Sequence, residues 1–193
     1  MSGKQSKAAY TSSPLFTHTA QHGLSFGVLR THYKEYVNDA SKFVAGKLAP
    51  ALPEGASWQL TAARSEVLLP DGVPDLLLDP LMLTQSYMDQ LPPKQLDLLL
   101  CFRAVLDPHH PLHSGWERAR SFARKTLVKD HGLPVIMVLH DPCRSGTKQP
   151  NPPHIHIMAP ARRLVQRGWA ECTNIACDEA QPGLVEAWRT TEG

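Results

Sequence analysis

The chain has 193 residues, of which 42% are hydrophobic and 20% are charged, and its formal net charge at pH 7 is +2. This length suits one compact domain, and the composition excludes a fully disordered or collagen-like chain. Its longest apolar stretches are far shorter than the roughly 20 residues that span a bilayer, and residues 1–10 lack the apolar core of a signal peptide. We therefore expect a single domain over residues 1–193 that is cytoplasmic and not inserted in a membrane.

Positive charge is concentrated in one segment of the chain. Residues 116–167 carry a net charge of +7, whereas the rest of the chain carries −5. A basic segment in an otherwise acidic chain is typical of a site for a polyanion, usually a nucleic acid, although a solvated helix face has the same pattern. The candidate DNA-binding residues in this segment are Arg118, Arg124, Lys125, Lys129, Arg162 and Arg163.

The first half of the chain gives few strong structural signals. Its first residues are rich in Ser, Thr, Gly and Ala, which predicts a flexible arm over residues 1–27. Residues 31–48 place apolar side chains three or four positions apart, which predicts an amphipathic helix. Further elements are expected at residues 66–69 (a strand), 79–90 (a helix) and 96–106 (a buried strand or a core helix).

The second half of the chain is more regular. Ser114 is a candidate N-cap of a helix that ends at Gly132. Strands are expected at residues 133–140 and 154–158, joined by a long polar loop, and such a pair forms an antiparallel hairpin. A helix followed by a hairpin indicates an α+β fold, with a central antiparallel β-sheet flanked by helices, and not a doubly wound sheet.

Three histidines lie on these two expected strands. His154 and His156 are two residues apart and therefore share one face of a strand, while Ile155 and Ile157 point to the other face. His140 ends the preceding strand, and antiparallel pairing would bring it beside the other two. Three neutral imidazoles on a rigid sheet could hold a divalent metal ion and leave positions open for water or substrate, as catalysis requires.

The segment LPVIMVLHDPCRSGTKQPNPPHIHIMAPARRL resembles the metal-binding part of the HUH relaxases that mobilise plasmids, the MobA/MobL group of the HUH endonuclease superfamily. In that group an apolar strand ends in His, a loop ends in Asn-Pro, and His-x-His follows with basic residues and a glycine after it. The helices expected at residues 116–129 and 185–189 also resemble that group. The resemblance covers residues 114–193 well and the first hundred residues poorly.

This resemblance implies an HUH relaxase-like fold and a DNA-nicking activity. Relaxases of this group cut one strand at the transfer origin of a plasmid or mobile element, acting on single-stranded DNA, in some cases with accessory mobilisation proteins. A tyrosine hydroxyl attacks the phosphodiester, and the protein becomes bonded to the 5′ phosphate. By position, the resemblance makes His140, His154 and His156 the ligands of a divalent metal, Mg or Mn, which stabilises charge on the phosphate.

The resemblance also points to a nucleophile near the N-terminus. Residues 6–10 resemble the small-residue stretch that ends in the catalytic tyrosine of the group, so Tyr10 is the candidate nucleophile. The group has a strand before this stretch, whereas only nine polar residues precede Tyr10 here. Tyr36 is the alternative, with Tyr33 more typical of a core residue. Where the group carries a glutamate on the strand before its Leu-Pro turn, this chain has Arg103.

Two other functions remain open from the sequence. A chain that has lost the tyrosine strand would be a non-cutting, HUH-like accessory protein that binds metal and DNA. His-x-His between hydrophobic residues also occurs in histidine-triad nucleotide hydrolases. Those enzymes have a third alternating histidine, and Met158 stands at that position here.

Overall fold

A five-stranded antiparallel β-sheet, with the strand order β1-β5-β7-β6-β4, organises the fold. The computed structural model describes residues 23–53, 55–107, 109–142 and 151–191. The strands of the sheet are β1 (Leu24–Arg30), β4 (Arg64–Leu68), β5 (Asp97–Val105), β6 (Val135–His140) and β7 (His154–Pro160). Two short hairpins lie outside it, formed by β2 (His32–Tyr33) with β3 (Tyr36–Val37) and by β8 (Arg162–Val165) with β9 (Gly168–Cys172).

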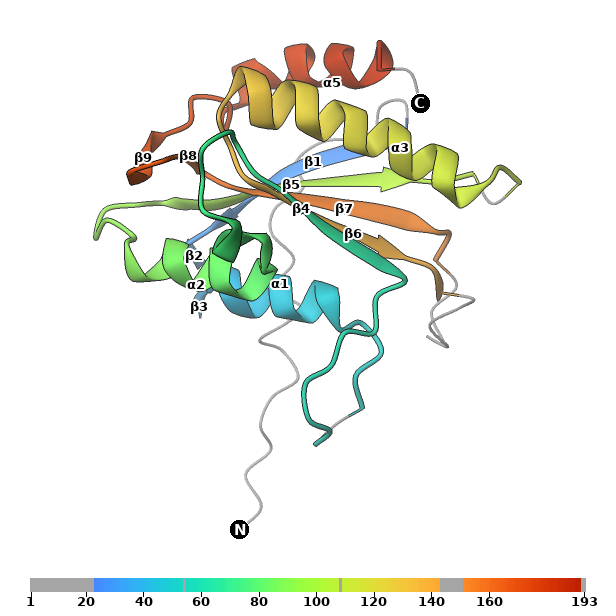
Figure 1. The fold of residues 1–193 in the computed structure, drawn as a ribbon, viewed down its shortest axis with the longest axis horizontal. Coiled ribbons are helices and arrows are strands. Elements are labelled where there is room, and N and C mark those ends of the chain that lie inside the picture. The colour runs from blue at the N-terminus through green and yellow to red at the C-terminus, as the bar shows by residue number, and fades with distance from the viewer. Residues whose placement is uncertain (1–22, 54, 108, 143–150, 192–193) are drawn as a thin grey trace.

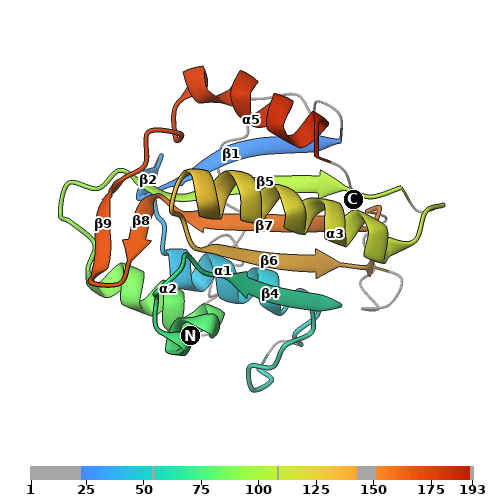
Figure 2. The same ribbon diagram turned by 45° about the horizontal axis from the view of Figure 1, so that its top comes forward.

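Helices cover both faces of the sheet, so that the sheet is the middle of three layers (Figure 1; Figure 2). One face is covered by α3 (Leu112–Phe122), its π-helical continuation η3 (Ala123–Asp130) and α5 (Gln181–Arg189). The opposite face is covered by α1 (Ala40–Leu48) and α2 (Pro80–Asp89). Single 3-10 turns are η2 (Asp75–Leu78) and η4 (Asp178–Ala180). Across the described ranges, no helix is long and apolar enough to cross a membrane.

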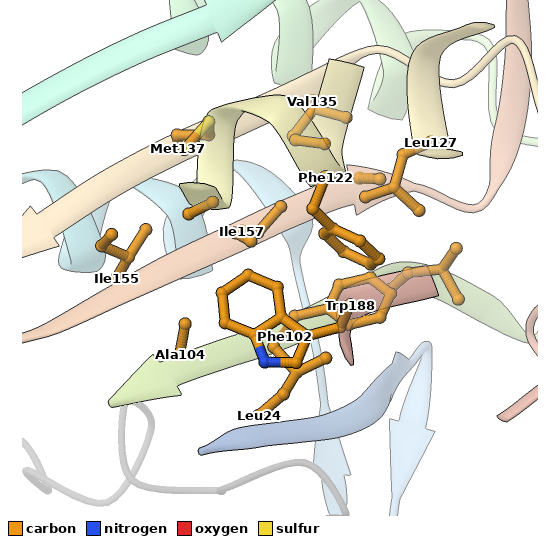
Figure 3. Close-up of a cluster of buried hydrophobic side chains, with 14 of the residues drawn as sticks. Leu24, Phe102, Ala104, Phe122, Leu127, Val135, Met137, Ile155, Ile157 and Trp188 are labelled. Carbon is orange, nitrogen blue, oxygen red and sulfur yellow. The ribbon is translucent and has the colours of Figure 1, made fainter. Parts of the chain in front are cut away.

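The core under α3 and α5 is built from alternate residues of the central strands (Figure 3). Phe102 of β5 and Ile157 of β7 point into this layer because residues two apart share a strand face. The rings of Phe102 and Phe122 have centroids 5.7 Å apart, and those of Phe122 and Trp188 are 5.6 Å apart. Phe122 therefore joins α3 to both the sheet and α5.

Most of the expected elements are present in the structure. The α+β class with a central antiparallel sheet is confirmed, and the hairpin expected from residues 133–140 and 154–158 is the β6–β7 pair. The segment 96–106, left open between strand and helix, contains β5. The helix expected at 79–90 is α2, whose first turn is capped by the Asp79 carboxylate, which accepts hydrogen bonds from two backbone N–H groups.

Three expected boundaries were wrong. The helix expected over residues 31–48 begins at Ala40, because Asp39 caps it there, and residues 32–37 form the β2–β3 hairpin around Lys34, whose φ is 53°. The arm expected over residues 1–27 ends earlier, since β1 begins at Leu24 and pairs with β5. Helix α3 begins at Leu112, so Ser114 lies within its first turn.

We expect Phe122→Ala to lower the free energy of unfolding by about 3–5 kcal/mol, because it removes a fully buried ring that links three elements. Chemical denaturation at equilibrium measures this change. The matched control is Leu96→Ala, at a side chain that is 70% exposed, which should change stability by no more than about 0.5 kcal/mol. Equal effects of the two substitutions would contradict this account of the core.

Candidate functional site: a three-histidine cluster

The register between β6 and β7 places three histidines together. His140 lies directly opposite His154, and His156 lies opposite Val138 on the same face of the sheet. This is the face covered by α1 and α2, because Val138 and Met158 belong to the core under those helices. Ile155 and Ile157 point to the other face, where both are fully buried. Burial of these isoleucines thus directs both histidines of β7 to one side.

The three imidazoles are close enough to share one ion. Their potential ligand atoms all lie within 4.8 Å of one another, and their ring centroids are 4.7–5.1 Å apart. Nitrogens that share an ion at roughly 2.1 Å lie about 3.5 Å apart, so the rings would have to rotate toward one another to bind one ion together. Within the described ranges, this is the one group of three or more His, Cys, Asp or Glu residues with such spacing. The arrangement is compatible with a divalent metal.

Main-chain carbonyls set the tautomers of two of the rings. Nε2 of His140 lies 2.6 Å from the carbonyl oxygen of Lys47, and Nδ1 of His154 lies 2.9 Å from that of Pro152. A carbonyl oxygen only accepts, so each of these ring nitrogens carries the proton. The lone pairs available to an ion are therefore on Nδ1 of His140 and Nε2 of His154.

Burial keeps the three rings neutral. Desolvation lowers the pKa of His154 to about 4, with smaller contributions from the charges of Arg103, His140 and Lys47. Burial likewise lowers the pKa of His140, and it holds the pKa of His156 well below the usual range. Neutral imidazole is the form that binds a metal, so the rings are ready to act as ligands near pH 7.

Two cations that sequence patterns did not assign to the site lie beside it. Arg103 of β5 is paired with His156 across the sheet. Lys47 lies in the last turn of α1, and its charge, like that of Arg103, lowers the pKa of all three histidines. The sequence resemblance had drawn attention to Arg103, because the relaxases that the sequence resembles carry a glutamate in the equivalent region. Lys47 gave no signal, because it is 93 residues away from His140 along the chain.

The basic residues of α3 and η3 lie on the other side of the sheet from the histidines. Arg124, Lys125 and Lys129 are exposed on η3. Arg118 is partly buried, since its guanidinium stacks on Trp188 at 4.4 Å and donates hydrogen bonds to two carbonyls at the end of α5. These four candidates therefore do not form one surface with the three-histidine cluster.

The two candidate residues of β8 hold the β8–β9 hairpin in place. Arg162 donates hydrogen bonds to the carbonyl oxygens of Gln90, Trp169 and Ala170. Arg163 forms an ion pair with Glu171. Both arginines follow the end of β7 that is distant from His154, so they also lie away from the cluster.

None of the tyrosines within the described ranges lies at the cluster. Tyr33 and Tyr36 are in the hairpin that follows Arg30, where β1 pairs with Asp97, whereas the histidines lie at the opposite end of β5. At 3.3 Å per residue these ends are about 20 Å apart. Tyr87 is fully buried, and its hydroxyl lies 3.4 Å from the Asp97 carbonyl oxygen. Tyr10, the candidate nucleophile, lies outside the described residues.

A three-layer α+β fold with a histidine cluster on its central antiparallel strands defines the class of the protein. No protein-family model and no curated protein matches the chain. A solved structure described as the "Molecular Basis of Vancomycin Resistance Transfer in Staphylococcus aureus" is similar, with a TM-score of 0.65 and 17% sequence identity. The match covers 87% of this chain and 88% of that chain. At this identity the likeness concerns the fold.

We expect the metal-free protein to lose stability as the pH falls from about 6.5 to 4. The unfolded chain protonates His154 near 6.5 and the folded chain only near 4, so the unfolded state binds more protons in this range. His154→Gln should remove up to about 1.4 kcal/mol per pH unit from this slope, or roughly 3 kcal/mol in all. Urea denaturation with a chelator at several pH values measures it.

Between pH 7 and 8 both states of His154 are neutral, so wild type and His154→Gln should there show parallel stability profiles. Parallel profiles below pH 6.5 as well would show that burial of His154 does not couple folding to protonation.

Proposed function

We propose that this chain is a metal-dependent DNA strand transferase, a relaxase of the MobA/MobL type that nicks single-stranded DNA at a transfer origin. The observation that carries the proposal is the convergence of three neutral imidazoles on one face of a relaxase-like sheet. The similar solved structure, which is described in terms of resistance transfer, supports this class of function. The motif around His140, His154 and His156 supports the MobA/MobL type.

In the proposed reaction the chain supplies both the metal site and the nucleophile. The lone pairs of His140, His154 and His156 would hold a Mg or Mn ion, which when bound offsets negative charge on the phosphate. The Tyr10 hydroxyl oxygen attacks phosphorus, a tyrosine–5′-phosphate bond forms, and the bond to the 3′ oxygen breaks. The phenol proton ends on the departing 3′ oxygen. The covalent bond conserves the energy needed to rejoin the strand.

A second candidate function is a non-cutting protein that binds metal and DNA. It is favoured by the tyrosines, because three of the four lie within the described ranges and each is remote from the cluster. Arg103 in place of a carboxylate agrees with it. A histidine-triad hydrolase is disfavoured, because the third alternating position is Met158, which is buried in the core under α1 and α2.

We expect the protein to form a covalent adduct with a labelled single strand carrying its transfer origin, in the presence of Mg or Mn. The adduct should survive denaturing gel electrophoresis. Tyr10→Phe should abolish it and leave DNA binding nearly unchanged, since only the attacking oxygen is lost. His156→Ala should weaken Mn binding and adduct formation together.

The matched control for the adduct is Tyr36→Phe, which should retain full yield. Loss of the adduct in Tyr36→Phe but not in Tyr10→Phe would make Tyr36 the nucleophile. A wild-type chain that binds origin DNA and metal but forms no adduct would establish the non-cutting function.

The proposal also predicts which basic residues contact phosphates. Neutralising Arg124, Lys125 and Lys129 together with glutamine should reduce the slope of log affinity against log salt by roughly 2, at about 0.7 per phosphate contact. Fluorescence anisotropy with a single-stranded oligonucleotide measures the slope. Arg162→Gln is the matched control. It should lower the melting temperature, because Arg162 binds three carbonyls, and it should change the salt slope little. An unchanged slope in the triple variant would exclude η3 as a DNA contact.

A further inference from the structure

Arg103 carries a positive charge that the described part of the chain does not neutralise. Its side chain is partly buried, and it has no hydrogen bond or ion pair with any described residue. The other arginines of comparable burial, such as Arg118, Arg120 and Arg162, all bind carbonyls or carboxylates. Removing a guanidinium from water without an acceptor costs free energy, and desolvation lowers its pKa. The Arg103 guanidinium is therefore suited to bind a hydrogen-bond acceptor that belongs to a ligand.

Lys47 adds a second positive charge to the same place. Its carbonyl oxygen accepts from His140, so the last turn of α1 lies directly against the cluster. Its ammonium lies 5.2 Å from the centre of the Phe43 ring, and its charge acts on Arg103's neighbour Cys101 and on the histidines. Burial lowers the pKa of Lys47 itself, and an anion bound beside the ammonium would favour its charged form. Burial raises the pKa of the Cys101 thiol to about 12, so this neighbour stays neutral.

The two positive charges beside the histidines do not suit a site that binds only a metal ion. Two cations beside three neutral imidazoles repel a divalent ion, and their charges add to desolvation, the larger cause, in lowering the imidazole pKa values. The same two cations attract an anion. A guanidinium offers planar pairs of N–H donors that match two oxygens of a phosphate, and an ammonium adds a point charge.

We infer that Arg103 and Lys47 bind one phosphate of the DNA strand beside the three-histidine cluster, and that this phosphate and the metal ion bind cooperatively. The inference rests on the proposed function for the identity of the ligand, a phosphodiester of single-stranded DNA. Once bound, the phosphate offsets both cations and lowers the repulsion felt by the ion. Thermodynamic linkage makes the effect reciprocal, so Mn should raise DNA affinity by the factor by which DNA raises Mn affinity.

Arg103→Gln tests this inference by binding, without any cutting step. The probes are Mn alone, a short oligothymidylate, and both together, followed by isothermal titration calorimetry. In wild type each ligand should strengthen the other at least fivefold. In Arg103→Gln the oligonucleotide should bind about tenfold more weakly and its salt slope should fall by about 0.7, while Mn without DNA should bind as tightly as in wild type or more tightly. Lys47→Gln should change the same quantities in the same direction.

The matched control is Arg30→Gln, at the end of the sheet distant from the histidines, where Arg30 forms an ion pair with Asp97, and it should leave oligonucleotide affinity and the coupling between Mn and DNA unchanged. Arg103→Lys retains the charge without the paired donors, so it should keep the salt slope and lose part of the affinity. It also serves as the test variant if Arg103→Gln does not fold, as judged by circular dichroism.

Unchanged oligonucleotide affinity and unchanged coupling in Arg103→Gln would overturn the inference. So would a loss of Mn binding equal to the loss of DNA binding, which would indicate a disrupted site. A wild-type chain that forms no covalent adduct but shows the coupling would refute nicking and leave the phosphate site intact. Failure of the phosphate site and failure of the proposed nicking activity are therefore distinguishable.

Discussion

The pairing of β6 with β7 is the constraint on which the site depends. His140 stands opposite His154, and a slip of one residue would turn the β7 histidines to the face under α3 and the isoleucines to the face under α1. Ile155 and Ile157 are both fully buried, so such a slip would expose the core to imidazoles and fill the site with aliphatic groups. The hydrophobic alternation that stabilises the sheet thereby also fixes the cluster.

Helix α1 connects this cluster to the rest of the fold. The last carbonyls of a helix have no intrahelical donors, and the Lys47 carbonyl obtains one from His140. One hydrogen bond thus satisfies the helix end and selects the tautomer of a potential metal ligand. The same turn brings in the Lys47 ammonium, whose charge, like that of Arg103 on β5, acts on all three rings. Helix α1, which covers one side of the core, therefore also contributes to the charge around the three rings.

The sequence was informative where one local pattern carried the information. Period-two alternation in β7 predicted that His154 and His156 share a face, and the structure confirms it. Contacts between distant segments had no such pattern, which is why Lys47 was not predicted. The spacing of Tyr33 and Val37 continued the helical period of α1 by coincidence and hid the β2–β3 hairpin. Charge density indicated basic residues on α3 and η3 but could not tell which face of the sheet those helices cover.

The separation of positive charge into two places bears on how DNA could be held. The exposed cations of η3 lie across the sheet from the histidines, near the end of β6 that is distant from His140. A DNA strand that contacts both places must pass around the sheet, about 16 Å along β6 and through the thickness of the sheet. In the function that we propose, local positioning of a phosphate at the three rings therefore falls to Arg103 and Lys47, whereas η3 contributes affinity alone. Cutting requires in addition that a tyrosine reach the α1 side, and DNA binding does not. The proposed nicking and the proposed DNA binding therefore make separate demands on the fold.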